Sequence, residues 1–381
     1  MKKKYIILSI IILVLLITFV TSFNYFKTSN NYVEDSVNNQ TKITKGISMN
    51  LEQTVGAGDY KQVTQSSWPT EGYKFNAELS KCENGGEISW DDTKKAVIVS
   101  GNLSDKCYVY FDIYQLTLAE YIKSQYTGTQ GDNALYYHNS TLTNGAGDNS
   151  YRYAGASDSV NNYICLGSDA TTCPDANLFR IIGVFGNQTK VIRAKSVGDQ
   201  QWHTSADNTW SSSSLNAYLN GTYLTSLGTI AEKIATTTWK VGGCSWSNIE
   251  TSVPKIVYKN EVGSSASTTT VDKKIGLMYI SDYYYSASPS AWTLVGYNKS
   301  DATKDYSAAK TINWLYLGSK EWTISRVSDE TFSAFIVDGS GHVFSYNVNF
   351  SNFAVRPSFN LDSTVTYVSG DGTKSNPIRI N

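Results

Sequence analysis

The sequence predicts an α+β protein in which an N-terminal transmembrane helix precedes a small disulfide-tied all-β module and a loop-rich α+β domain. An unbroken apolar run extends from Tyr5 to Phe23, directly behind three lysines. Short runs of alternating apolar and polar residues fill residues 67–114, as expected for strands. Beyond residue 115, strand patterns are mixed with short helix signals.

The Tyr5–Phe23 run contains no charge, proline or glycine. As a helix it would cover roughly 28 Å, close to the hydrocarbon thickness of a bilayer of about 30 Å. The preceding lysines favour a cytoplasmic amino end, so residues 1–26 are expected to be a retained single-pass anchor in the cell membrane, with the rest of the chain extracellular. The alternative is a cleaved signal peptide, with the cut after Val20-Thr21-Ser22 and a secreted product.

Composition limits the class of partner. The chain has 32 basic and 33 acidic side chains and a formal net charge of −1, so no basic field would attract nucleic acid. It is rich in tyrosine (27 residues), tryptophan (9) and glycine (28). Such residues suit binding surfaces, and they equally suit the strands of extracellular β proteins that have one wet face.

The five cysteines predict two disulfides in an oxidising compartment. The economical pairing is Cys82–Cys107 and Cys165–Cys173, which leaves Cys244 alone. By loop entropy, the first disulfide should stabilise the folded state by roughly 3–4 kcal/mol and the second by about 2.5 kcal/mol. No CxxC spacing occurs, so a zinc ribbon has little support.

Along the chain, residues 27–66 are polar and read as a stalk, because they offer too little apolar surface for a core. Residues 67–114 form the small β module and residues 115–381 the larger domain. Strands of the module are expected near residues 73–77, 88–90, 96–99 and 107–111. In the larger domain we expect helices after Thr117 and over 215–219 and 227–236, and strands over 178–185, 190–194, 274–280, 314–317, 321–325, 332–337, 342–346, 365–368 and 378–380.

Several segments carry a resemblance over roughly residues 50–381: Asp148–Tyr153, Asn161–Cys165, Lys274–Asp282, Glu321–Ser325 and Val355–Leu361. The C-terminal part resembles the C-type-lectin-like fold in its formylglycine-generating-enzyme-related branch, and is similar to uncharacterised surface proteins of Firmicutes-type bacteria. The resemblance implies an architecture and a surface location. Enzymes of that branch depend on a copper-binding cysteine pair, which Cys244 alone cannot supply, so their activity is not expected here.

The binding hypothesis centres on Asp282, Tyr283, Tyr284, Tyr285 and Trp292. Three successive tyrosines cannot all point inward from a strand, so at least one should be exposed or line a groove. Aromatic planes beside polar side chains suit sugar rings or peptide segments. The alternative is that these residues brace a long loop against the core.

Enzymatic alternatives use other residues. A hydrolase could use Asp282, Glu321 and Asp338, or Cys244 with His342 as its base. His138 and His203 complete the histidines. The Asp- and Asn-rich segment 127–162 lacks the spacing of a calcium loop, so no metal ligand is assigned. No catalytic residue and no cofactor is assigned either.

Together these observations predict a cell-surface-anchored extracellular binding or adhesion protein. Its expected partners are the membrane, through the N-terminal helix, and a glycan or protein ligand, without nucleic acid. The alternatives are a secreted or surface hydrolase of cell-wall or glycan substrates, and a purely structural envelope protein.

Overall fold

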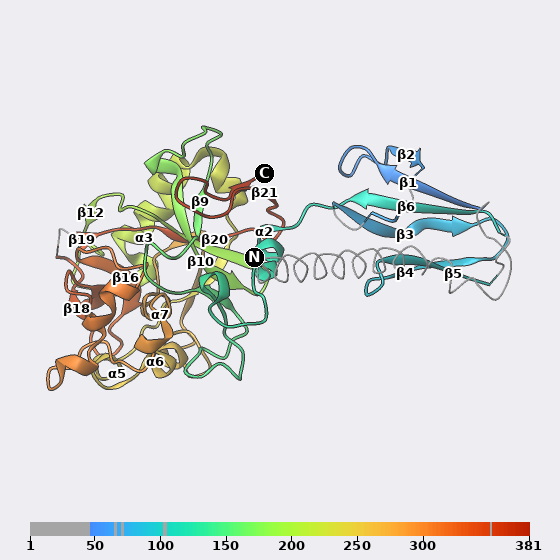
Figure 1. Cartoon of the computed structure of the whole chain (residues 1–381). Coiled ribbons are helices and arrows are strands. Elements are labelled where there is room, and N and C mark those ends of the chain that lie inside the picture. Colours follow the sequence, from blue (N-terminus) through green and yellow to red (C-terminus); the bar gives the residue numbers. More distant parts are fainter. Residues whose placement is uncertain (1–45, 65–66, 70–71, 102–104, 351–352) are drawn as a thin grey trace, which may run out of the picture. The chain divides into compact units, whose positions relative to one another are not determined.

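The computed structural model describes residues 46–64, 67–69, 72–101, 105–350 and 353–381. These residues form mostly strands and loops, with 21% helix. The chain divides into two compact units between Gln115 and Leu116 (Figure 1). We call them the N-terminal and C-terminal units and describe each by itself.

The N-terminal unit is built from two small antiparallel or mixed sheets. One has four strands in the order β2-β1-β6-β3, with β1 and β6 parallel, and the other is the β4–β5 hairpin. The strands are β1 (Ile47–Glu52), β2 (Tyr60–Val63), β3 (Tyr73–Cys82), β4 (Glu87–Asp91), β5 (Ala96–Ser100) and β6 (Cys107–Ile113).

Alternate residues of β1 and β6 make the core of this unit: Met49 and Leu51 lie with Val109 and Phe111. Trp90 from the hairpin packs edge-on against Phe111, with ring centroids 5.5 Å apart. Strands β1 and β2 fall within the segment expected to be a polar stalk. The expected stalk is therefore wrong for these residues. Met49 and Leu51 are enough to bury one face of β1, because the neighbouring strand β6 contributes Val109 and Phe111.

The C-terminal unit contains a seven-stranded antiparallel sheet at its centre (Figure 1). Its order is β15-β20-β11-β10-β8-β7, and β9 also pairs with β10. The Gly186-Asn187 turn joins β10 to β11 as the sequence predicts, and Gly186 has the positive φ of 62° that this turn requires. The strands are β7 (Leu135–Tyr137), β8 (Tyr151–Tyr153), β9 (Tyr163–Cys165), β10 (Leu178–Phe185), β11 (Gln188–Arg193), β15 (Ile275–Gly276) and β20 (Ser358–Leu361).

A five-stranded sheet and two ribbons complete the strands of this unit. The five-stranded order is β12-β19-β16-β17-β18, and the ribbons are β13–β14 and β21–β22. Their bounds are β12 (Asp199–Gln200), β13 (Thr237–Lys240), β14 (Thr270–Lys273), β16 (Glu321–Arg326), β17 (Ser333–Val337), β18 (Val343–Asn347), β19 (Phe353–Ala354), β21 (Tyr367–Ser369) and β22 (Arg379–Ile380).

The helices are short, and α6, with eight residues, is the longest α-helix that the structure describes. The α-helices are α2 (Leu118–Ser124), α3 (Ser214–Tyr218), α4 (Leu224–Ser226), α5 (Trp246–Thr251), α6 (Pro254–Glu261) and α7 (Ile280–Tyr285). A π-helical turn spans η4 (Leu219–Tyr223), and the 3-10 turns are η1 (Asp132–Ala134), η2 (Asp175–Asn177), η3 (Trp210–Ser212), η5 (Gly228–Lys233), η6 (Pro289–Ala291), η7 (Ala302–Lys304) and η8 (Tyr306–Ile312).

The predicted α+β fold class is therefore wrong, because strands and loops carry most of the described chain. Among the described residues, no helix has both the length and the hydrophobicity needed to cross a bilayer. The predicted anchor, Tyr5–Phe23, lies outside the described residues. The expected strand at 314–317 is also absent, and most of the expected strand at 274–280 is loop leading into α7.

Candidate functional site

The five residues of the binding hypothesis are all buried. Asp282, Tyr283, Tyr284, Tyr285 and Trp292 are between 0 and 2% exposed. The expectation of an exposed aromatic surface at these positions is corrected, because the tyrosines lie on helix α7 inside the core rather than on a strand.

Helix α7 forms because its first N–H groups find carboxylates. Glu261 accepts hydrogen bonds from the backbone N–H groups of Ile280 and Ser281, each at 2.9 Å, and Asp282 accepts one from Tyr279 at 2.8 Å. The aromatic side chains then brace loops, as in the alternative interpretation. Their polar atoms donate to backbone carbonyls: Tyr283 to Gly341, Tyr285 to Asn144 and Trp292 to Ala287.

One of the five residues, Asp282, reaches a pocket. This pocket has a volume of about 210 Å³ and lies among β8, β10, β11, β13, β20, α6 and α7. Its lining includes Asp282, Lys190 and Arg152, together with aromatic rings and hydroxyl groups. We call it the Lys190 pocket.

Lys190 and Asp282 form a buried ion pair in this pocket. The Nζ–Oδ2 distance is 2.5 Å, and both side chains are almost fully buried. Burial lowers the pKa of the Lys190 ammonium, while the nearby Asp282 carboxylate acts in the opposite direction. The ammonium also lies 4.4 Å from the ring centroid of Tyr279 and 5.2 Å from that of Trp239.

A second ion pair joins Arg152 to Asp148, with 2.6 Å between Nη2 and Oδ2. Tyr258 donates to the same carboxylate at 2.9 Å. Burial favours the neutral form of Asp148, but the charge of Arg152 and hydrogen bonds from Ser150 outweigh burial and hold the pKa of Asp148 well below its ordinary value. Arg152 Nη1 lies 3.9 Å from Asp282 Oδ1, so the two ion pairs are neighbours.

Asn360 contributes an unused acceptor to the lining. Its Nδ2 donates to Thr237 Oγ1 at 3.0 Å, but its buried Oδ1 has no hydrogen-bond partner. Buried polar atoms are normally paired, so an unpaired acceptor beside a pocket is typical of a place where a ligand or water donates. The pocket thus combines charges, hydroxyl groups and aromatic walls, which is the usual make-up of a small-molecule site.

The carboxylates proposed for a hydrolase are held in separate networks. Glu321 receives two hydrogen bonds from Arg356, at 2.6 and 2.7 Å, within the core. Asp338 accepts from Ser340 in the β17–β18 turn. Neither residue lines the Lys190 pocket, so Asp282 has no second carboxylate from this predicted set beside it.

Cys244 is a buried thiol outside both disulfides, 3% exposed. Burial raises its pKa well above the ordinary value, and the carboxylates of Glu261 and Asp329 add to this. The thiolate that a cysteine nucleophile needs is therefore disfavoured. His342, its proposed base, instead lies 2.9 Å from Asp305 and 2.8 Å from the Ser340 hydroxyl.

The Asp305, His342 and Ser340 side chains contain the groups of a serine-hydrolase triad. None of these three residues lines the Lys190 pocket, and Ser340 also donates to Asp338 at 2.7 Å. We interpret His342 as a tie between the β17–β18 turn and the loop at Asp305. Of the other histidines, His138 is fully buried beside Tyr285 and Trp292, and His203 lies in an exposed loop beside Ser205.

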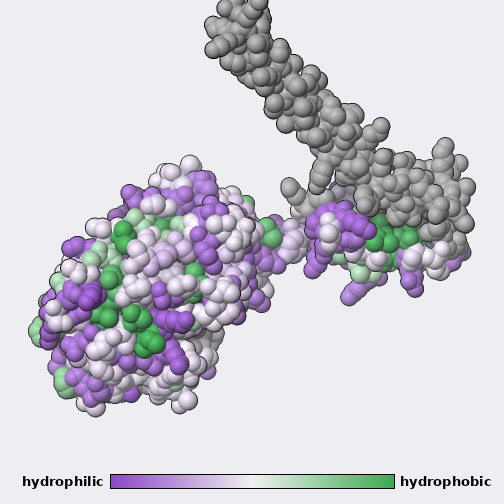
Figure 2. Space-filling model, turned by 60° about the horizontal axis from the view of Figure 1, so that its bottom comes forward, coloured by the Kyte–Doolittle hydropathy of each residue, from purple (hydrophilic) through white to green (hydrophobic). Residues whose placement is uncertain are grey.

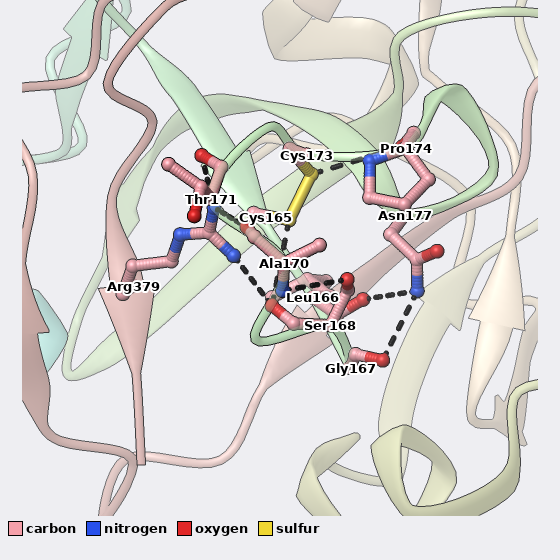
Figure 3. Close-up of a disulfide and its surroundings, with 10 residues drawn as sticks. All are labelled: Cys165, Leu166, Gly167, Ser168, Ala170, Thr171, Cys173, Pro174, Asn177 and Arg379. Carbon is pink, nitrogen blue, oxygen red and sulfur yellow. Dashed lines mark hydrogen bonds between the residues drawn. A yellow bond between two sulfur atoms is a disulfide. The ribbon is translucent and has the colours of Figure 1, made fainter.

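Both predicted disulfides are present: Cys82–Cys107 and Cys165–Cys173. The second closes a loop at the edge of a larger pocket, of about 570 Å³. Figure 3 shows Arg379 reaching into this loop, where its guanidinium donates to the carbonyls of Ser168, Ala170 and Thr171. The guanidinium of Arg379, a lining residue of the larger pocket, is therefore engaged by the loop itself.

Sequence reasoning missed every pocket residue except Asp282. Lys190 and Arg152 did carry a signal, since each interrupts an apolar or aromatic strand, where a charge needs a buried partner. The partner of Lys190 lies 92 positions away, which no local pattern reveals. Within the described residues, no group of three or more His, Cys, Asp or Glu side chains could hold a metal ion.

Comparisons with known proteins give a match over part of the chain. No curated protein and no solved structure matches the chain. The resemblance to bacterial surface proteins is therefore untested and stays a prediction. Over residues 186–363, which include Lys190, Asp282 and Asn360 but not Asp148 or Arg152, the chain is similar to a family described as Domain of unknown function (DUF6273).

Proposed function

We propose that this protein is an extracellular binding protein whose C-terminal unit takes one sugar residue of a glycan into the Lys190 pocket. The observation that carries the proposal is the buried Lys190–Asp282 pair opening onto a pocket with aromatic walls and an unused Asn360 acceptor. Sugars present hydroxyl groups at their edges and C–H groups on their faces, and this lining offers partners for both.

Two disulfides support the extracellular location, because such bonds persist mainly in oxidising compartments. Anchoring through Tyr5–Phe23 belongs to the same proposal. Figure 2 shows one face of the C-terminal unit as mostly polar, with small separate apolar areas. That face favours a polar ligand over a large apolar protein partner.

The test uses the full chain, a glycan array and two matched variants. Thr238 is an exposed residue of β13 that lines the pocket, so Thr238→Trp should fill its mouth without disturbing the core. Thr270 is exposed on the paired strand β14 but does not line the pocket, so Thr270→Trp is the control.

We expect glycan binding by the native chain and the Thr270→Trp variant, and a loss of at least about 10-fold in the Thr238→Trp variant. Equal binding by both variants would place the ligand elsewhere. Release of reducing sugar from a bound glycan would instead identify a hydrolase.

A further inference from the structure

Resting on the proposed function, we infer that the sugar taken by the Lys190 pocket is acidic: a sugar ring that carries a carboxylate, of the hexuronic acid type. The inference follows from the charge balance of the lining, from N–H groups of Lys190 and Arg152 that have no acceptor, and from the unpaired acceptor Asn360 Oδ1.

The lining carries more positive than negative charge. Arg152, Lys190 and Lys240 face two carboxylates, Asp148 and Asp282. Those carboxylates pair with Arg152 and Lys190, and within the described chain no carboxylate oxygen lies within 4.0 Å of Lys240 Nζ. An anionic group on the ligand would balance this remaining charge.

Glu261 lies behind this lining, and its carboxyl acts on Lys190 electrostatically without facing the pocket. It is buried and does not line the pocket. Its oxygens accept from the backbone of α7 and from Ser325. Burial also raises the pKa of this carboxyl, which disfavours its negative charge.

Hydrogen-bond donors are also in excess. The Lys190 ammonium has three N–H groups and gives one of them to Asp282. Arg152 uses Nε on Ser150, at 2.8 Å, and Nη2 on Asp148, while Nη1 has only the 3.9 Å approach to Asp282. Two cations with N–H groups left over suit an acceptor with several lone pairs, and a carboxylate is such an acceptor.

The other polar groups indicate a ring with several hydroxyls. Asn360 Oδ1 needs a donor. The Thr237 hydroxyl, which accepts from Asn360, can still donate, and the Thr238 hydroxyl, which donates to Asp272, can still accept. A peptide carboxyl end would bring a carboxylate with a single N–H nearby, and would leave most of these groups unused. At about 30 Å³ per water, the pocket holds the volume of about seven waters, which fits one sugar ring rather than a longer segment.

The experiment is calorimetric titration of the full chain with three probes: methyl glucuronide, methyl glucoside and N-acetyl-dialanine. The two sugars differ only at the carboxylate, and the dipeptide carries a carboxylate without a sugar. We expect the glucuronide to bind at least about fivefold more tightly than the glucoside, the size of a single partly exposed charge pair.

Lys240→Met should lower glucuronide affinity by about fivefold and leave glucoside affinity unchanged. Lys273→Met is the control, because Lys273 lies on the partner strand β14 and does not line the pocket. Equal binding of both sugars, abolished by Thr238→Trp, overturns the inference and leaves the proposed function standing. Tighter binding of the dipeptide overturns the sugar class, and no binding of any glycan overturns the proposed function itself.

Discussion

Arg356 and Glu321 face each other in the core of the C-terminal unit, 3 and 1% exposed. Arg356 also donates to the Leu315 carbonyl at 2.6 Å, so its removal leaves a buried charge and a carbonyl without a donor. We expect Arg356→Met to lower the free energy of unfolding by about 3–5 kcal/mol in urea denaturation. The matched control is Lys195→Met, which breaks the exposed pair with Asp175 and should cost at most about 1 kcal/mol. Similar losses in the two variants would contradict this account.

Cys244 gives a second prediction for a single residue. Since the buried thiol has a raised pKa, iodoacetamide at neutral pH should leave it unmodified in the folded chain and modify it in urea, as read by mass spectrometry. Full labelling of the native protein would show that the thiol is accessible and ionised, and would reopen the cysteine-nucleophile alternative.

The partner of a residue could be predicted from the sequence where the two residues are close along the chain. Cys165 and Cys173 are eight positions apart, and Cys82 and Cys107 are 25 apart, so the economical pairing was correct. Lys190 and Asp282 were not predictable as a pair, because 92 positions separate them, with four strands (β12–β15) and four α-helices (α3–α6) in between.

At the scale of one element, helix α7 depends on Glu261. This residue accepts hydrogen bonds from Ile280, Ser281 and Ser325. Glu261→Gln removes one acceptor oxygen and should lower the free energy of unfolding by about 1–3 kcal/mol near pH 4. Burial raises the pKa of Glu261, and the hydrogen bonds only partly offset that effect.

The pH dependence of this effect has a definite sign. A carboxyl with a raised pKa in the folded state stabilises the fold when protonated, and that contribution is lost as pH rises from the unfolded value of about 4.3 through the folded pKa. The native chain should therefore lose stability over this range relative to Glu261→Gln, so the difference between them shrinks. Urea denaturation at several pH values measures it, and a difference that grows with pH would contradict the raised pKa.

Elements followed from sequence where local chemistry determines them. The β10–β11 hairpin needs only a Gly-Asn turn between two apolar runs, and α2 needs only the Thr117 and Glu120 capping box, which the structure contains. Asp282 gives helix α7 one local cap, but the acceptor for Ile280 and Ser281 is Glu261, about twenty positions upstream, which no local pattern reveals. Because this helix was not predicted, Tyr283, Tyr284 and Tyr285 were expected to form a binding face, although they lie in the core.

For the whole molecule, the two units have separate cores, one around Phe111 and one that runs through the C-terminal unit. Each unit also has its own disulfide. Separate cores favour separate cooperative unfolding, so differential scanning calorimetry of the full chain should resolve two transitions.

Removing each disulfide in turn should show which transition belongs to which unit. The 25-residue closure contributes about 3.5 kcal/mol and the eight-residue closure about 2.5 kcal/mol by loop entropy. C82S/C107S should lower only the transition of the small N-terminal unit, by at least about 10 °C, since a small unit has a small unfolding entropy. C165S/C173S should lower only the other transition, and by less. A common shift of both transitions in either variant would mean that the units unfold as one, because a closure that acts on one core can move the other only when the two are coupled.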